Sequence, residues 1–266
     1  MKVARIPMLP LFLALGLFGI AVDLARADSF MIMGNDLRQS PAEYSLTGTF
    51  LGSFNAPAGS GVTFDGAGHL YVDYPEASQI SEFDSAGTHL NTISYTGHFG
   101  ESLAYDSVNS SIWLAGSDGS ITDLSLSGIV LGSFTISTSA FVPGVAFDGT
   151  FLYTSAGLYG NDVITQRLLD GTPVSTIIAY FPGYLNSWDA SSLAYDATDG
   201  TLWAGYNGEV REFRLDGTLL TSLATPDANF YHDGLTVGSF VVPEPPSLLL
   251  VGSILGAAGL FRRLLR

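Results

Sequence analysis

A repeated phrase constrains the fold of this chain more than any other feature of its sequence. The phrase is a small residue, two further apolar or small residues, an aromatic residue and an aspartate, and it recurs at steps of 41, 42, 48 and 42 residues. A strand-like segment with an aromatic residue follows each of the first four copies, after a short turn. The copies are GVTFD (61–65), SLAYD (102–106), GVAFD (144–148), SLAYD (192–196) and the imperfect GLTVG (234–238).

A second series of markers falls later in each unit. A residue followed by glycine stands at 47–48, 86–87, 127–128, 170–171 and 216–217, between segments of alternating apolar and polar residues. Such pairs supply the positive φ that tight hairpins require. Four strands per unit at a period near 42 residues are typical of one blade of a β-propeller.

The two ends of the repeat array are incomplete in complementary ways. Three strand-like segments near 30–34, 43–47 and 49–54 precede the first full unit, and one innermost segment, 234–240, follows the last. Pairing the N-terminal strands with the C-terminal inner strand completes a further blade and hides sheet edges that an open array would expose. We therefore predict an all-β, five-bladed β-propeller closed in this way, with six or more blades as the alternative.

The N-terminus has the organisation of a secretory signal peptide. Two basic residues precede the apolar stretch 6–22, and the small residues Ala25 and Ala27 mark a cleavage site for signal peptidase after residue 27. A first transmembrane helix is the alternative, but Pro7 and Pro10 interrupt the stretch. The predicted organisation is a signal helix over 1–27, a propeller over 28–241 and a C-terminal anchor over 242–266.

The C-terminal anchor consists of a proline-rich motif, an apolar span and a basic end. The apolar span 247–261 would form a helix of about 22 Å, shorter than the ~30 Å hydrocarbon core of a bilayer. Its basic end is expected to stay cytoplasmic, which leaves the propeller outside the membrane. The motif and the basic end comprise Pro243, Glu244, Pro245, Arg262 and Arg263.

Charge and cysteine content narrow the classes of partner and chemistry. The predicted propeller carries 23 acidic residues and four arginines, a net charge near −19, which repels nucleic acid and anionic lipid. No cysteine is present, so disulfides, thiol chemistry and Cys-ligated metals are excluded. Cofactors are not expected, although the acidic surface would suit calcium.

Two resemblances extend this interpretation. The repeat phrase resembles the NHL and YVTN-like propeller repeats, which implies the fold but no activity. The motif Pro243-Glu244-Pro245, the single apolar span and the arginine cluster together resemble the PEP-CTERM sorting signal. That resemblance implies recognition and cleavage by exosortase, a Gram-negative host, transient anchoring in the inner membrane, and association with exopolysaccharide and biofilm matrix.

The four aspartates of the repeat phrase could bind a metal ion or could cap turns. Asp65, Asp106, Asp148 and Asp196 each stand where a strand enters a turn that contains Gly or Asn. An Asp side chain at such a place accepts backbone N–H bonds. We therefore expect these carboxylates to cap turns.

Ligand-binding residues are expected on the loops that lead into the inner strands and on those that join second to third strands. Aromatic rings beside carboxylates and amides are suited to sugars, because a ring covers an apolar sugar face while polar groups bind its hydroxyls. The same residues also serve as ordinary loop packing. The candidates are His98, Glu101, Asn161, Asp162, Trp188, Asp189, Tyr231, His232 and Asp233.

The favoured function is a non-enzymatic, exported envelope or matrix protein that binds polysaccharide or another matrix protein. The alternative is a propeller enzyme, a hydrolase or lyase acting on polysaccharide or lactone, in which His98 and His232 converge with Glu101 or Asp233 on zinc or calcium. No residue spacing requires such a metal site, and no catalytic motif is present. No catalytic residue is therefore assigned from the sequence.

Overall fold

The computed structural model describes most of the repeat region. The described residues are 29–34, 40–96, 100–136, 144–158, 161–179, 192–206, 208–225 and 232–238. They contain twenty β-strands and one short 3₁₀ turn, η1 (Pro75–Ala77). The predicted signal segment and the proline-rich anchor lie outside these residues. Within them, no helix has the length and apolar character needed to cross a membrane.

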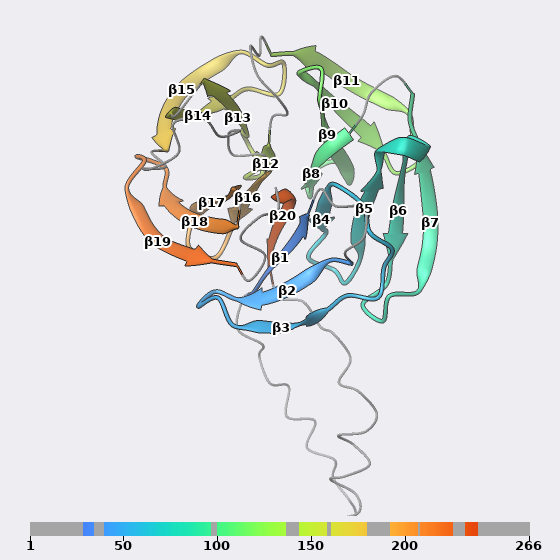
Figure 1. Cartoon of the computed structure of the whole chain (residues 1–266). Helices are drawn as coiled ribbons and strands as arrows, with labels where there is room; N and C mark the ends of the chain where they lie inside the picture. The colour runs from blue at the N-terminus through green and yellow to red at the C-terminus, as the bar shows by residue number, and fades with distance from the viewer. Residues whose placement is uncertain are drawn as a thin grey trace, which may run out of the picture.

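The strands form five antiparallel sheets of four strands, arranged as blades around a common centre (Figure 1). Blade 1 contains β20 (His232–Gly238), β1 (Ser29–Gly34), β2 (Ala42–Ser45) and β3 (Phe50–Ser53). Blade 2 contains β4 (Val62–Phe64), β5 (Leu70–Tyr74), β6 (Gln79–Phe83) and β7 (His89–Ser94). Blade 3 contains β8 (Gly100–Asp106), β9 (Ser111–Gly116), β10 (Ser120–Ser125) and β11 (Val130–Thr135). Blade 4 contains β12 (Val145–Phe147), β13 (Leu152–Leu158), β14 (Asn161–Arg167) and β15 (Pro173–Ala179), and blade 5 contains β16 (Ser192–Asp196), β17 (Thr201–Tyr206), β18 (Glu209–Arg214) and β19 (Leu219–Ala224).

The ring closes through the chain ends, as the complementary half-blades predict. β20 pairs antiparallel with β1, from Ser29 opposite Gly238 to Met33 opposite Gly234. The inner strands β20, β4, β8, β12 and β16 contact one another in that order, and β16 contacts β20 again. The two described ends of the chain, Ser29 and Gly238, therefore lie at the same end of the blade 1 sheet.

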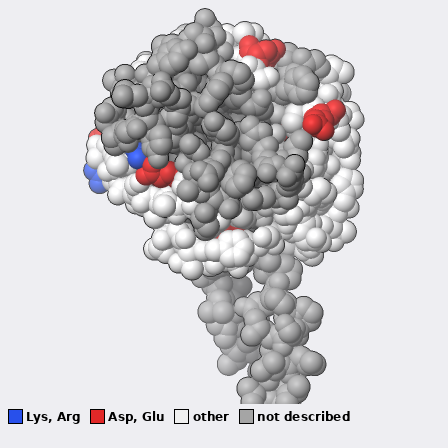
Figure 2. Space-filling view, viewed as in Figure 1, with Lys and Arg blue, Asp and Glu red and all other residues white. Residues whose placement is uncertain are grey.

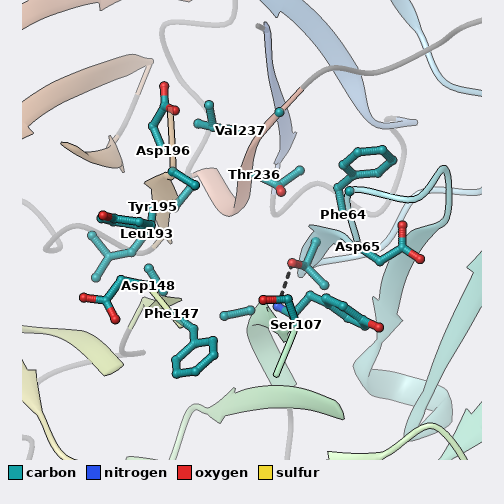
Figure 3. Close-up of a pocket in the computed structure, with 18 of the residues that line it drawn as sticks. Phe64, Asp65, Ser107, Phe147, Asp148, Leu193, Tyr195, Asp196, Thr236 and Val237 are labelled. Carbon is teal, nitrogen blue, oxygen red and sulfur yellow. Dashed lines mark hydrogen bonds between the residues drawn. The ribbon is translucent and has the colours of Figure 1, made fainter. Parts of the chain in front are cut away.

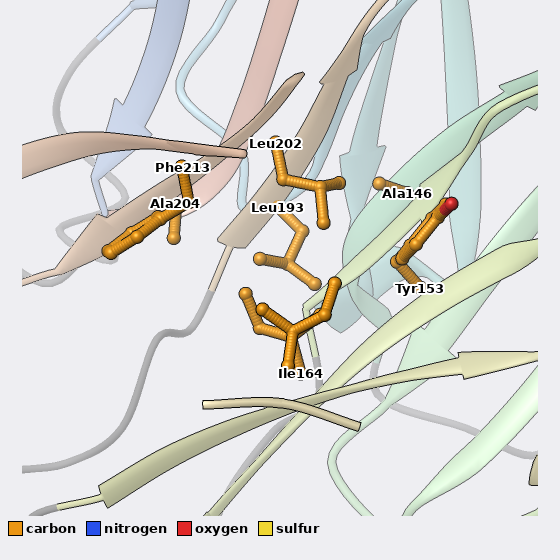
Figure 4. Close-up of a cluster of buried hydrophobic side chains, with 8 residues drawn as sticks. Ala146, Tyr153, Ile164, Leu193, Leu202, Ala204 and Phe213 are labelled. Atoms are coloured by element: carbon orange, nitrogen blue, oxygen red, sulfur yellow. The ribbon is translucent and has the colours of Figure 1, made fainter. Parts of the chain in front are cut away.

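Adjacent blades are held together by apolar side chains from their facing sheets. Between blades 4 and 5, Tyr153 and Ile164 on one side pack with Leu193 and Leu202 on the other, and all four are buried (Figure 4). Comparable clusters join blades 2 and 3 and blades 3 and 4. Each blade thus buries its apolar faces against its neighbours, so one continuous core circles the ring.

Hydroxyl side chains accept hydrogen bonds from backbone N–H groups of the inner strands. These strands have a neighbouring strand on one side only, so their other backbone groups need side-chain partners. The backbone N–H of Tyr105 donates to Thr63 Oγ1 of the preceding blade at 3.0 Å. The N–H of Val145 donates to Ser102 Oγ at 3.1 Å. A small polar residue in the repeat phrase therefore links one inner strand to the next.

The glycines of the second marker series allow close approach between blades as well as a positive φ. A Cβ on Gly128 would lie 2.4 Å from the carbonyl oxygen of Ser94, at the end of β7 in the preceding blade. A Cβ on Gly87 would lie 2.6 Å from the carbonyl oxygen of Asn55, just after β3. The turn between third and fourth strands thus rests directly on the neighbouring blade.

Candidate functional site

The repeated aspartates end the inner strands, and each accepts backbone N–H bonds from its own turn. Asp65 Oδ1 accepts from Ala67 and His69, and Asp106 Oδ1 accepts from Val108 and Asn109. The prediction that these carboxylates cap turns is confirmed for all four. The other two sets of contacts join Asp148 Oδ1 to the N–H groups of Thr150 and Phe151, and Asp196 Oδ1 to that of Thr198.

Asp148 caps its turn and also accepts a bond from a buried tyrosine, which makes its removal informative. Its second oxygen, Oδ2, accepts the hydroxyl of Tyr153 at 2.8 Å, and that hydroxyl in turn accepts Gln166 Nε2 at 3.1 Å. We expect Asp148→Ala to lower the free energy of unfolding by about 2 kcal/mol, because it leaves a buried phenol and two turn amides without their acceptor. Urea unfolding of Asp148→Ala against Asp170→Ala tests this. Asp170 accepts a bond from Thr172 N in an exposed turn and contacts no buried phenol, so a loss of equal size in both variants would contradict the expectation.

A concave feature shared by all five blades is the mouth of the central channel, where the five inner strands end (Figure 3). Its volume is about 420 Å³. The lining comes from all five blades and includes small residues of the repeat phrase, namely Thr63, Ala104, Ala146, Ala194 and Thr236. Because every blade contributes the same strand position, the mouth is a ring of repeated elements and not one specialised loop.

The carboxylates at this mouth do not converge on a common point. In Figure 3 those of Asp65, Asp148 and Asp196 lie at the margin and point away from one another. Each is directed into its own turn by the bonds described above. Consistent with this, the described part of the chain contains no group of three His, Asp or Glu side chains placed to hold a metal ion.

Two tyrosines of the repeat phrase pack at the junctions between adjacent blades. The ring of Tyr105 stacks on Tyr71 of the preceding blade with centroids 5.7 Å apart, and that of Tyr195 stacks on Tyr153 at 6.2 Å. Burial, and secondarily the carboxylate of Asp148, raises the pKa of Tyr153 well above its usual range. The phenol of Tyr153 therefore remains protonated, packs between the blades and donates a hydrogen bond to Asp148.

Blade 3 contains a buried carboxylate that is not one of the turn-capping aspartates. Asp123 on β10 is 7 % exposed and lies opposite Trp113 of β9. Burial raises the pKa of Asp123, and the charge of Asp106 raises it further, while Ser111 opposes the shift. Because the folded pKa is raised, the stability contributed by this group is present below the unfolded pKa and is lost as pH rises through the folded pKa.

Replacement of this carboxylate should accordingly stabilise the protein at neutral pH. We expect Asp123→Asn to raise the free energy of unfolding at pH 7 by on the order of 1 kcal/mol. The advantage should shrink toward zero as pH falls below the unfolded pKa of Asp, near 4. Denaturant unfolding of both proteins at pH 4 and pH 7 measures it, and an advantage independent of pH would show that ionisation is not its cause.

The sequence-predicted ligand residues that fall within strands lie at the opposite end of the sheets from this mouth. Glu101 is at the start of inner strand β8, and His232 and Asp233 are at the start of inner strand β20. Asn161 and Asp162 begin β14, directly after the turn from the second strand of blade 4. The backbone therefore brings these five positions to the same end of their blades. This is the end at which the loops into the inner strands and the loops between second and third strands lie.

Four of the predicted ligand residues, His98, Trp188, Asp189 and Tyr231, lie outside the described residues. So do the sorting-motif and cleavage residues, Pro243, Glu244, Pro245, Arg262, Arg263, Ala25 and Ala27. The proposed convergence of His98 and His232 on a metal likewise stays a prediction.

A buried carboxylate close to the predicted binding end was missed by the sequence interpretation. Asp73 on β5 is fully buried and accepts the hydroxyl of Tyr95 at 2.8 Å. A Cβ on Gly100 would lie 2.6 Å from Asp73 Oδ2, so the start of β8 passes directly over this carboxylate. An acidic residue inside the apolar segment LYVDY was the signal available in the sequence.

Charged side chains are scattered over the face seen in Figure 2. The described Asp and Glu side chains on this face lie apart from one another. The acidic character of the chain is therefore not concentrated there into one patch of described residues.

Comparison with known proteins supports the β-propeller fold and identifies neither a family nor a function. No protein-family model matches the chain, and no curated protein matches it. Among solved structures, a crystal structure of a nidogen/laminin complex is similar, with a TM-score of 0.52 at 13 % identity. The match covers 81 % of this chain and 99 % of the other. A likeness at this identity establishes a shared propeller architecture only.

Proposed function

We propose that this protein is an exported, non-enzymatic binding propeller that is tethered by its C-terminal segment and binds a matrix polysaccharide. The observation that carries the proposal is the opposed placement of two features on blade 1. β20 ends at Gly238, opposite Ser29, whereas His232 and Asp233 stand at the other end of the same strand. A tethered ring would thus present its predicted ligand loops away from the point of attachment.

The nature of the binding end supports a polysaccharide. Its predicted loops carry the aromatic residues Trp188 and Tyr231. They also carry polar residues, namely Asn161 and Asp162 in blade 4, Glu101 in blade 3 and Asp233 in blade 1. A strongly acidic propeller disfavours nucleic acid and anionic lipid as ligands. A matrix protein remains the second kind of partner that such a surface would suit.

The route of export rests on the two end segments. Signal peptidase would remove 1–27, and exosortase would process the chain near Pro243-Glu244-Pro245 after transient anchoring in the inner membrane. A matrix role for this chain is our inference. The expected location is the cell surface or extracellular matrix of a Gram-negative bacterium.

A glycan and polysaccharide binding screen on the processed propeller, with and without calcium, tests the function. We expect saturable binding that Trp188→Ala weakens by at least about tenfold, since a stacked aromatic side chain is typical of the residues that dominate such interfaces. Phe50→Ala is the matched control, because Phe50 is an exposed aromatic residue on outer strand β3. Absence of binding by a folded sample, or equal loss in both variants, would contradict the proposal.

A further inference from the structure

The third strand of every blade carries a carboxylate or carboxamide at one equivalent position. Each of these side chains lies opposite a large residue of the second strand in the sheet register. Blades 1, 2 and 5 have glutamate at this position, blade 4 has glutamine, and blade 3 has the shorter aspartate. In blade order the pairs are Glu43 with Met31, Glu82 with Tyr71, Asp123 with Trp113, Gln166 with Tyr153, and Glu212 with Trp203.

In two blades the glutamate accepts a direct hydrogen bond from a hydroxyl group of the second strand. Ser29 Oγ donates to Glu43 Oε1 at 2.9 Å in blade 1. Thr201 Oγ1 donates to Glu212 Oε1 at 2.9 Å in blade 5. Each hydroxyl residue stands two positions before the large residue of its strand, so both side chains lie on the same face of the sheet. A glutamate at the third-strand position is therefore long enough to reach this hydroxyl.

Blade 3 has the equivalent hydroxyl but not the direct bond. Ser111 stands two positions before Trp113 on β9, and it lies near enough to Asp123 to oppose the rise in the pKa of that carboxyl. Among the described residues, however, Ser111 Oγ and Asp123 Oδ1 have no hydrogen-bond partner, and neither has Trp113 Nε1. Because aspartate is one methylene shorter than glutamate, it does not reach the hydroxyl in hydrogen-bonding geometry.

The three polar atoms lie at a closed junction between blades 3 and 4. Ser111, Trp113 and Asp123 are 0 %, 2 % and 7 % exposed. The blade 4 residues that pack with Trp113 include the apolar Val145 and Leu152, which offer no side-chain donor or acceptor. A buried polar atom without a partner is costly, and buried polar groups are satisfied by protein or by ordered water.

The carboxylate nearest to Ser111 in the register is engaged elsewhere. Asp106 lies opposite Ser111 at the end of β8. Its Oδ1 accepts the backbone N–H groups of Val108 and Asn109, and its Oδ2 accepts Asn109 Nδ2. Asp106 is thus held in its own turn, and the polar atoms of Ser111, Trp113 and Asp123 need a further partner.

We infer that one buried water molecule bridges Trp113, Asp123 and Ser111 at the junction of blades 3 and 4. The water accepts the indole N–H and donates one proton to Asp123 Oδ1, and it exchanges a third hydrogen bond with the hydroxyl of Ser111. Three partners are typical of a buried water. A cation would suit the oxygen atoms but not the indole, because an N–H donor cannot coordinate a cation. The water thus joins the second and third strands of blade 3, as the longer glutamates do directly in blades 1 and 5.

Nuclear magnetic resonance of the full chain labelled with ¹⁵N-tryptophan tests the inference, because the three tryptophans give a simple set of indole signals. Trp113→Phe assigns the signal of Trp113. Dipolar transfer from water to this indole proton reports a long-lived water beside it, and comparison of laboratory-frame and rotating-frame spectra separates that transfer from proton exchange. The other indole signals report whether each variant is folded.

Two matched variants separate a bound water from its alternatives. Asp123→Glu should abolish the transfer, because the longer carboxylate reaches Ser111 directly and takes the place of the water. Ser111→Ala combined with Asp123→Asn keeps the shorter side chain and removes the hydroxyl and carboxyl protons that could relay magnetisation from bulk water. This double variant should keep the transfer.

Three results would overturn the inference. The first is the absence of transfer to Trp113 in the unaltered chain. The second is its loss in the folded double variant, which would assign the signal to relay through a side-chain proton, or its persistence in folded Asp123→Glu. The third is an indole signal that receives no transfer and shifts with sodium or calcium concentration, which would assign the place to a cation.

Discussion

A chain that ends at residue 230 should fail to form a stable ring, whereas one that ends at 241 should fold. The shorter chain lacks β20, so β1 loses the partner with which it pairs from Ser29 to Gly34. It also loses Leu235, which is 1 % exposed and packs with Trp203 and Val210 of blade 5. We expect a loss of more than about 5 kcal/mol, comparable to the whole stability of a typical domain.

Urea unfolding followed by tryptophan fluorescence measures this effect, because Trp113 and Trp203 are buried at blade junctions. Both truncated chains lack the C-terminal anchor, so their difference isolates the closing strand. Equal unfolding midpoints would contradict the closure and would mean that four complete blades and the three remaining strands of blade 1 are stable without β20.

The second large effect is expected at a glycine where two blades touch. Gly128 has φ +82°, and a Cβ there would lie 2.4 Å from the carbonyl oxygen of Ser94. Backbone atoms cannot rotate away as a flexible side chain can. We therefore expect Gly128→Ala to cost about 1 kcal/mol for the left-handed backbone and about 1–3 kcal/mol more for displacing the adjacent blade.

Gly66→Ala is the matched control for that substitution. Gly66 has φ +75° in the turn after β4, and a Cβ there meets no atom within 4 Å. The two variants share the backbone penalty and differ in the clash with the neighbouring blade. Unfolding free energies that agree within error would show that the contact between Gly128 and Ser94 is not a constraint on the ring.

Much of the fold was predictable because the repeat phrase encodes local structure. An aspartate before a glycine-containing turn can cap that turn without long-range help, and the contacts of Asp148 confirm this. The incomplete ends predicted the pairing of β20 with β1 because an unpaired sheet edge is costly.

Other features of the structure depend on contacts between blades, and the repeat phrase does not predict these contacts. The approach of Gly128 to Ser94 joins residues of different blades, and a turn glycine looks the same with or without it. The burial of Asp73 likewise depends on Gly100 of the next blade, where a Cβ would lie 2.6 Å from Asp73 Oδ2. The candidate ligand site was predictable only as a set of loop positions, because its side chains come from several blades and carry no fixed spacing.

The location of bound polysaccharide on the ring tests the central claim most directly. Hydrogen–deuterium exchange of the processed propeller, with and without a polysaccharide identified by the binding screen, reports amide protection at each end of the inner strands. We predict protection at the starts of β8, β14 and β20, around Glu101, Asn161 and His232. Protection instead at the channel mouth, around Gly66 and Gly149, would contradict the claim that the ring binds its ligand at the end opposite Ser29 and Gly238.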